Sequence, residues 1–509
     1  MSVISVRQLY RNIYSQWFMQ IIRSAVSFIV TAIVARILGP SGYGVATSIF
    51  VFAGLFSFAI DPGFGGSVVR YISVYSGSSK DYIPIVSGFL IYRMVVSLML
   101  AIAFYIIAPW FAILTGASEH AAAFQVFALS IFLGSIYSGL RAYLYGIGYI
   151  NLASLYYSIG FIIGNVSSLI LVLSGFGILG YVLGFVIGDV VQFSIYIYAL
   201  RNLIIKCIRV KLGDAVKGLR IILPLSLTLL GSRLMNFLYE WFDRALVLGL
   251  LGTYDLGLYN VALRLSSIFG TAKHAVTTAL TPYYGNLYGA KGVEAIRPRV
   301  KRISKLVSLT YTPAVLTIAG LTPILIPLIY GSRFIESWRV AFVHLVFIAL
   351  MGFEVAYGGI ALITEAKRDI VVSSMIKSVS SIALELLLTV VAGLGALGVI
   401  IGKNLGALAS FLYLYLVLFR SLRLGLNLKY WIMGVFTGIL ILILTMPLIL
   451  QGSNNGLWYI TPIIALIIYT LLLRILKPID NTDIKILREA LGTRLQKIAN
   501  IIENVLDVH

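Results

Sequence analysis

One arginine stands among neutral polar residues in a stretch that is otherwise apolar. Between residues 14 and 38, the polar positions are Gln16, Gln20, Arg23, Ser27 and Thr31. Steps of three or four residues place them on one narrow face of an α-helix. A guanidinium group in such a stretch is costly, and its planar fork of donors matches phosphate oxygens. Arg23 therefore predicts binding of an anionic ligand.

Two further apolar stretches carry polar faces of the same kind. One, between residues 258 and 284, consists of Arg264, Ser267, Thr271, His274 and Thr278. The other, between residues 220 and 251, consists of Arg233, Asn236, Glu240, Asp243 and Arg244. Three polar faces on apolar helices predict a shared aqueous cavity. Its predicted substrate-binding residues are Arg23, Arg264, Arg233, Gln20, Ser27 and Asn236.

Acidic residues in apolar stretches are candidates for ion coupling. Asp61 precedes Pro62-Gly63, which should interrupt the helix between residues 44 and 69. Aspartate at such a break is a good N-cap for a restarted half-helix, and the same group can act as a proton- or sodium-sensitive switch. The full predicted coupling set is Asp61, Asp243, Glu240, Asp189 and Glu354. No metal or cofactor is predicted, only a coupling ion that is a proton or sodium.

Simpler interpretations exist for several of these charges. Glu240 and Arg244 are four residues apart and can pair on their own helix, which is as well supported as a cavity role. Arg93 and Lys403 lie near helix ends or the cytoplasmic side, where long side chains snorkel to water. Arg23 has no acidic residue within one helical turn, so local pairing explains it less well.

The composition indicates a membrane protein. Of 509 residues, 60% are hydrophobic and 11% are charged, and the mean hydropathy is +0.98. Soluble domains are about 25% charged. Apolar windows of about 20 residues, the length that spans a bilayer, recur along the chain and predict about 14 transmembrane helices. The predicted fold class is an all-α polytopic membrane protein.

The net charge of +20 follows membrane topology. With a cytoplasmic N-terminus, nearly all basic loop residues fall on inner segments, and the outer loops hold only Arg36, Arg333 and Arg339. This is the positive-inside pattern. It predicts a multi-pass cell-membrane protein with both termini cytoplasmic and contacts with anionic lipids, and it argues against nucleic-acid binding. The single cysteine, Cys207, excludes an intramolecular disulfide.

An internal repeat divides the chain. "VARILGPSGYGVATSIFVFAG" at residue 34 is echoed by "VLGLLGTYDLGLYNVALRLSSIFG" at residue 247, with Gly42 aligned to Gly257 and Ala46 to Ala262. Both copies join the first and second helices of a six-helix block, so the repeat is parallel. The predicted parts are six-helix lobes at 1–200 and 220–425, a basic cytoplasmic linker at 201–219, two added helices at 426–476 and an amphipathic cytoplasmic tail at 477–509.

No enzyme signature accompanies this organisation. The predicted outer loops are about a dozen residues at most, and the chain has no HExxH, DxD, CxxC or Walker pattern. The glycines of "ARILGPSGYG" lack the Lys-Ser/Thr that follows them in a phosphate-binding loop. An enzyme and an ATP-driven pump are therefore disfavoured.

The motifs "ARILGPSGYG", "DPGFGGSVVRYIS" and "FDRALVLGLLGTYDLGLYNVALRL" resemble the polysaccharide biosynthesis flippases of the multidrug/oligosaccharidyl-lipid/polysaccharide exporter superfamily. The resemblance implies a flippase for polyprenyl-phosphate or pyrophosphate glycans that works by alternating access. It implies that helices one, two, seven and eight line the cavity, with Arg23, Asp61, Arg233 and Arg264 facing it. In the related lipid II flippases, arginines on helices one and eight serve the pyrophosphate.

Two other functions remain open from the sequence. One is an ion-coupled multidrug or small-molecule exporter of the same superfamily, which would favour acids over arginines in its cavity. The other is a membrane scaffold in a glycan assembly complex. For the flippase, the predicted substrate is a lipid-linked oligosaccharide. For the scaffold, the predicted partners are glycan assembly proteins.

Overall fold

The computed structural model describes residues 6–451 and 461–476. The helices of this part are α1 Val6–Ile60, α2 Phe64–Gly77, α3 Ile83–Leu114, α4 Ala121–Gly146, α5 Ile150–Leu171, α6 Gly177–Ala199, α7 Arg201–Ile208, α8 Leu212–Leu251, α9 Thr253–Lys291, α10 Val293–Tyr330, α11 Ser337–Leu350, α12 Ile360–Ile363, α13 Lys367–Leu386, α14 Gly395–Leu414, α15 Leu428–Gln451 and α16 Thr461–Leu476. No β-strand occurs in the described part, so the predicted all-α class is confirmed. The amphipathic tail predicted at 477–509 lies outside the described residues.

The helices are long and apolar enough for a multi-pass membrane protein. Eight described helical stretches qualify as spans, or nine with the bent pair Ser337–Leu350 and Gly352–Ile363. Two of the eight, Phe18–Ile60 and Ile150–Ala199, have 43 and 50 residues. At 1.5 Å per residue these would be about 65 and 75 Å long, against a bilayer core of about 30 Å, so each holds two passes. The total of 14 helices stays a prediction.

The chain forms two compact units, and each is described by itself. The first unit comprises Met1–Arg264, Ile329–Phe334 and Ser381–Val399. The second comprises Leu265–Leu328, Ile335–Ser380 and Ile400–His509. The unit boundary falls inside α9, directly after Arg264. The division into six-helix lobes stays a prediction.

In the first unit, α1 turns sharply at one residue. Gly39 has φ 69° and ψ 176°, and helical conformation resumes at Pro40. Glycine reaches positive φ without steric cost, and proline's fixed φ suits the first position of a helix. The loop that the sequence predicts between residues 38 and 44 is therefore shortened to a single glycine.

The two copies of the predicted repeat touch each other at this turn. A Cβ atom on Gly44 would lie 1.7 Å from the carbonyl oxygen of Thr253 and 3.2 Å from the nitrogen of Gly257. A Cβ atom on Gly257 would lie 2.1 Å from the carbonyl oxygen of Pro40 and 3.1 Å from the nitrogen of Gly44. The contact is reciprocal, as a two-fold relation requires. Only glycine at both positions permits this backbone approach.

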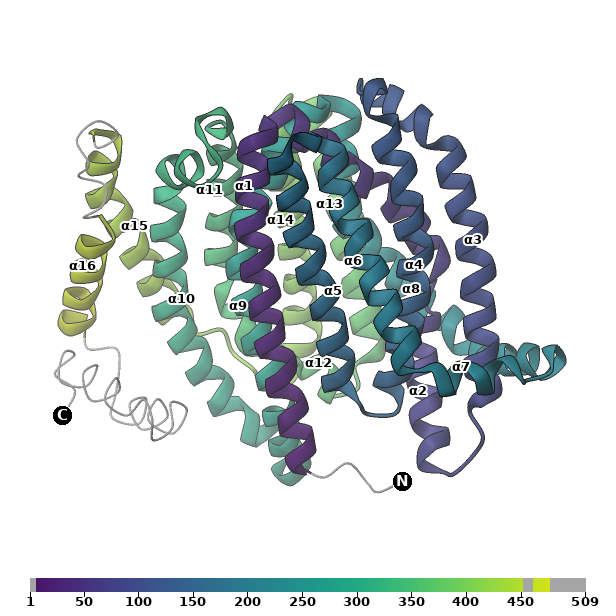
Figure 1. The fold of residues 1–509 in the computed structure, drawn as a ribbon. Coiled ribbons are helices and arrows are strands. Elements are labelled where there is room, and N and C mark those ends of the chain that lie inside the picture. The colour runs from purple at the N-terminus through teal and green to yellow at the C-terminus, as the bar shows by residue number, and fades with distance from the viewer. Residues whose placement is uncertain (1–5, 452–460, 477–509) are drawn as a thin grey trace. The chain divides into compact units, whose positions relative to one another are not determined.

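Helices α1, α4, α5 and α6 pack side by side in the first unit (Figure 1). The α5–α6 pair is close because Gly164 faces Gly188, where a Cβ atom on Gly164 would lie 3.0 Å from the Cα of Gly188. Small residues four apart allow such approach between membrane helices. This packing fixes the position of α5 beside α1, and with it the residues that α5 presents to Arg23.

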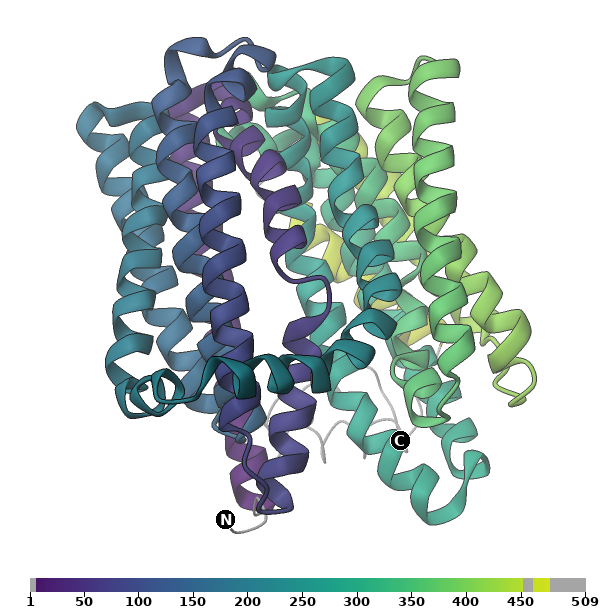
Figure 2. The ribbon, with the colours of Figure 1, turned by 90° about the vertical axis from the view of Figure 1, so that its right-hand side faces the viewer.

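The basic linker is helical. Figure 2 shows α7 and the first turns of α8 running across the ends of neighbouring helices of the first unit. Leu203 and Cys207 of α7 are buried, and Arg201 and Lys206 are exposed. The Ser87 hydroxyl of α3 donates to the backbone carbonyl of Cys207 at 2.9 Å. Burial raises the pKa of the Cys207 thiol to about 11.

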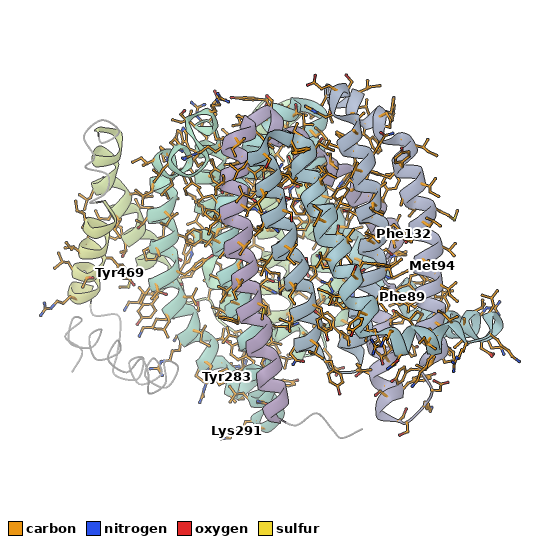
Figure 3. The ribbon with its side chains drawn as sticks, viewed as in Figure 1. Phe89, Met94, Phe132, Tyr283, Lys291 and Tyr469 are labelled. Atoms are coloured by element: carbon orange, nitrogen blue, oxygen red, sulfur yellow. The ribbon has the colours of Figure 1, made fainter. Side chains whose placement is uncertain are left out.

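Side chains on one helix separate into buried and lipid-facing sets. On α3, Phe89 is fully buried in the core of the first unit, whereas Met94 is 51% exposed (Figure 3). In the second unit, buried apolar clusters form around Tyr284 with Tyr357 and around Val315 with Leu345. Exposed apolar side chains in both units are expected where lipid replaces water as solvent.

Candidate functional site

The polar face of α1 is a ladder of hydrogen-bonding groups inside the first unit. Ser27 and Thr31 are buried, Arg23 is half-buried and Gln20 is exposed. Nη2 of Arg23 donates to Oε1 of Gln20 at 2.5 Å, within one turn of the same helix. Gln20 and Arg23, which the sequence places on one face of the helix, therefore interact directly.

Arg264 reaches this face from α9. Its Nη2 donates to the hydroxyl of Ser27 at 2.9 Å and to the hydroxyl of Thr31 at 3.3 Å. The structure thus brings four of the predicted substrate-binding residues to this face, Gln20 in contact with Arg23 and Ser27 in contact with Arg264. Arg264 contacts α1 one to two turns beyond Arg23, about 6 to 12 Å along the helix axis.

Arg23 is held by neutral groups. Its Nη1 donates to the hydroxyl of Ser158 on α5 at 2.6 Å, and its Cζ lies 5.1 Å from the centroid of the Tyr157 ring. Ser158 in turn donates to the carbonyl of Ser154 at 2.6 Å. Within residues 6–451 and 461–476, no acidic side chain forms an ion pair with Arg23. Its positive charge is therefore not neutralised there by protein.

Asp61 lies at the predicted break between α1 and α2 and caps the restarted helix. Its Oδ1 accepts from the backbone nitrogens of Gly63 at 3.3 Å and Gly65 at 3.0 Å. It also forms ion pairs with Arg93 of α3, through Oδ2, and with Arg233 of α8, at 2.9 Å. Arg233, a predicted substrate residue, is therefore placed on a carboxylate and is 46% exposed.

Arg93 is not a snorkelling residue. Its side chain is only 4% exposed, and besides Asp61 it donates to the carbonyl of Ser135 at 2.7 Å and to the hydroxyl of Ser138 at 2.5 Å. Lys403 of α14 in the second unit is also buried. Sequence position near a helix end was the basis for the snorkelling expectation. Polar partners at the same depth explain why Arg93 stays inside.

Asp243 belongs to a buried network at the start of the second repeat copy. Its Oδ2 accepts from the hydroxyl of Tyr259 at 2.9 Å. Nε of Arg244 donates to Oδ1 of Asn260 at 3.2 Å. The sequence also allows an ion pair between Glu240 and Arg244. In the structure, Nη1 of Arg244 donates to the backbone carbonyl of Glu240 at 2.8 Å.

The remaining predicted residues have partners of their own. Asp189 of α6 accepts from the hydroxyl of Tyr137 at 3.0 Å, and Asn236 of α8 donates to the carbonyl of Ser232 at 2.9 Å. Glu354 belongs to the second unit, where it forms an ion pair with Lys273 of α9. The coupling roles of these acids stay predictions. Among the described residues, no group of three or more His, Cys, Asp or Glu could hold a metal ion.

A family comparison bears on this geometry. The family model described as "Polysaccharide biosynthesis protein" matches residues 33–339. The chain belongs to this family. The matched range includes Asp61, Arg233 and Arg264, and begins ten residues after Arg23. The family resemblance carried by the sequence motifs is thereby confirmed.

Solved structures share the fold of this polysaccharide biosynthesis family member. The lipid II flippase MurJ in an inward closed conformation aligns with a TM-score of 0.71 at 16% identity, covering 90% of this chain and 98% of that one. An inward-facing multidrug resistance MATE family transporter of the MOP superfamily aligns with a TM-score of 0.58 at 17% identity, covering 85% and 96%. A Vibrio cholerae MATE transporter aligns with a TM-score of 0.53 at 19% identity, covering 84% of this chain and 98% of that one. Comparison with curated proteins gave no significant match.

Sequence reasoning missed two arginines of this family member. Arg93 was expected to snorkel, and Arg141 of α4 is not among the predicted substrate-binding residues. Arg141 lies with its Cζ 4.5 Å from the centroid of the same Tyr157 ring that Arg23 approaches. Neither contact leaves a spacing signal, because each joins residues on different helices. Pairwise contacts across helices cannot be read from one sequence.

Proposed function

We propose that this protein is a flippase that moves a lipid-linked oligosaccharide from the cytoplasmic to the outer leaflet for polysaccharide biosynthesis. Family membership and the fold likeness to a lipid II flippase support a membrane transporter for a lipid-linked substrate. The observation that carries the proposal is Arg23, a half-buried guanidinium on α1 whose side-chain partners are all neutral. A polyprenyl phosphate or pyrophosphate supplies the anion that matches it.

Binding uses the α1 ladder in this proposal. Arg23 and Arg264 donate to phosphate oxygens, and Ser27, presently an acceptor from Arg264, exchanges its partner when the anion arrives. Gln20 holds the Arg23 fork toward the ladder from one turn away. Hydroxyl and amide partners suit this task, because they position a guanidinium without neutralising its charge.

Transport requires the site to open alternately to each leaflet, driven by a proton or sodium gradient. Asp61 is the strongest coupling candidate because it joins a helix break to two other helices through Arg93 and Arg233. Protonation of Asp61 would release both arginines. Asp243, Glu240, Asp189 and Glu354 remain secondary candidates, and Arg233 and Asn236 would line the path on α8.

The multidrug-exporter alternative has less support from the first unit. A site for cationic drugs needs a carboxylate that is available to the drug, whereas Asp61 is held by two arginines and Asp243 accepts from the buried Tyr259 hydroxyl. The scaffold alternative is addressed by the transport experiment itself, because a scaffold moves no lipid.

The test is transport in proteoliposomes that contain the purified full-length protein and a fluorescent polyprenyl-diphosphate sugar. Wild type should move the probe between leaflets, and Arg23→Ala and Arg264→Ala should slow it by about 10- to 100-fold each, as expected for loss of charge-assisted bonds of about 1.5–3 kcal/mol. Arg70→Ala is the matched control, because Arg70 is exposed and lies only on Tyr71.

The outcomes separate the alternatives. No movement by wild type would overturn the flippase proposal and favour a scaffold. Wild-type rates in both arginine variants would remove the phosphate role from the α1 ladder. Movement of a cationic dye in place of the diphosphate probe would favour the multidrug exporter.

A further inference from the structure

Two arginines share one tyrosine in the first unit. The Cζ atoms of Arg23 on α1 and Arg141 on α4 lie 5.1 Å and 4.5 Å from the centroid of the Tyr157 ring on α5. The two guanidinium carbons are therefore no more than 9.6 Å apart, the sum of these distances. Three helices thus converge on one pair of positive charges.

In the part of the chain that the structure describes, acidic side chains do not offset this pair. Across the described ranges, the ion pairs of acidic side chains go to other cations, and neither Arg23 nor Arg141 forms one. Two like charges at this separation repel, most strongly where water is partly excluded. The face of a tyrosine ring attracts a cation but only weakly. Among the described side chains, the pair therefore has no compensating anion.

The surroundings favour an ordered binding site over a loose surface patch. Ser158, next to Tyr157, is 1% exposed and fixes Nη1 of Arg23 at 2.6 Å. Tyr156 packs edge-on against Tyr196 with ring centroids 5.6 Å apart, which anchors this turn of α5 to α6. Both arginines are only half-buried, so part of each side chain remains exposed.

We propose that Arg23 and Arg141, held on Tyr157, form a two-arginine site for the diphosphate group of a polyprenyl diphosphate. This rests on the proposed function and deepens it. Each guanidinium fork takes the oxygens of one phosphate in bidentate fashion, and the two phosphates bridge the gap between the forks. A monophosphate can engage only one fork fully, so the site discriminates between the two.

The position of the site gives it a role in the transport sequence. With the N-terminus cytoplasmic, Arg23 precedes the Ser27–Thr31 contact of Arg264 on the way outward along α1. The Arg23–Arg141 pair is then the loading site, and Arg264 is the next cation that the diphosphate meets. In this sequence of steps, Arg141 contacts the diphosphate only at the loading site.

The experiment is calorimetric titration of the full-length protein in nanodiscs of neutral lipid, with inorganic pyrophosphate and inorganic phosphate as probes. Wild type should bind pyrophosphate at least about tenfold more tightly than phosphate. Arg141→Ala should weaken pyrophosphate binding about 10- to 100-fold and reduce the preference, and Arg141→Lys should recover only part of it. Tyr157→Phe, which keeps the ring, should bind as wild type does, and Tyr157→Leu should bind more weakly.

The matched control is Arg201→Ala, because Arg201 also lies on a single tyrosine, with Cζ 4.9 Å from the Tyr198 ring centroid, but has no second arginine there. Its pyrophosphate affinity should equal that of wild type. An Arg141→Ala affinity within about twofold of wild type would overturn the site, as would equal affinities of wild type for the two probes. Thermal unfolding of each variant identifies a loss that comes from misfolding, and Arg141→Gln then provides the milder replacement.

Transport in the same nanodisc preparation, transferred to liposomes, separates this site from the proposed function. A wild type that flips the diphosphate probe while Arg141→Ala flips it equally well overturns the site and leaves the flippase intact. A wild type that binds pyrophosphate through Arg141 but flips nothing supports the site and overturns the flippase.

Discussion

Two charged clusters of the first unit use arginine in opposite ways. At the break after α1, Asp61 is surrounded by Arg93, Arg233 and two backbone nitrogens. Around Tyr157, Arg23 and Arg141 lie on the same ring, and no acidic side chain in residues 6–451 or 461–476 forms an ion pair with either. The first cluster contains its own counter-charge and the second does not.

The difference separates charges that stabilise the fold from charges that are available to a ligand. A buried carboxylate with a buried guanidinium is costly to disrupt from one side only, because the remaining partner is left uncompensated. Removing a guanidinium whose partners are neutral leaves no charge uncompensated, so the free energy of unfolding should change little. We therefore expect stability to depend on the Asp61 cluster and ligand binding on the Tyr157 cluster.

The largest effect should come from Arg93→Ala. The substitution leaves Asp61 without its buried partner and should lower the free energy of unfolding by about 3–5 kcal/mol. Cys207 provides the measurement, since it is the only cysteine and is buried. Its thiol should react slowly with maleimide in the folded state and quickly once the protein unfolds. In the folded state, the reaction should speed up as the pH rises toward the thiol pKa of about 11.

A second substitution checks the cause. Asp61→Asn combined with Arg93→Met removes both charges and should regain at least half of the lost stability. A loss below about 1 kcal/mol in Arg93→Ala would contradict the structural role of this cluster.

A smaller effect on stability is expected from Arg23→Gln. Two hydrogen bonds are lost, but so is the cost of keeping a charge half-buried, and the net change should stay within about 1 kcal/mol. The same labelling of Cys207 measures it. A loss as large as that of Arg93→Ala would show that the Tyr157 cluster also holds the fold together, and the contrast between the clusters would fail.

The smallest effect should come from Arg233→Ala. This side chain is 46% exposed and shares Asp61 with Arg93, so solvent screening keeps its contribution to about 0–1 kcal/mol. The loss should shrink further at high salt, because exposed ion pairs are screened. A salt-independent loss would place Arg233 in a drier setting than its exposure implies.

Periodicity explains what could be predicted from the sequence. The polar face of α1 and the break at Asp61 are encoded by residues close together in the chain, so the Gln20–Arg23 contact and the capping of α2 by Asp61 were accessible. The family motifs are local as well. The fold class and the family could be predicted because they depend on such local features.

Contacts between helices explain what could not be predicted. Arg93 was expected to snorkel because it lies near a helix end or the cytoplasmic side, and nothing near it in the sequence shows that it pairs with Asp61, 32 residues earlier. Arg141 and Tyr157 likewise meet Arg23 only through the packing of α4 and α5 on α1. A single sequence contains the side chains of such clusters but not their neighbours.

The crossing of Gly44 and Gly257 has a consequence for biogenesis. These residues are 213 positions apart in the chain, the difference of their numbers, and they meet without any side chain between them. At about 5–20 residues per second of synthesis, the first hairpin waits about 10 to 40 s in the membrane before its partner is made. During that interval its glycine face is open to lipid or to insertion factors, so the first helices must be kept from pairing with other chains until the second repeat copy arrives.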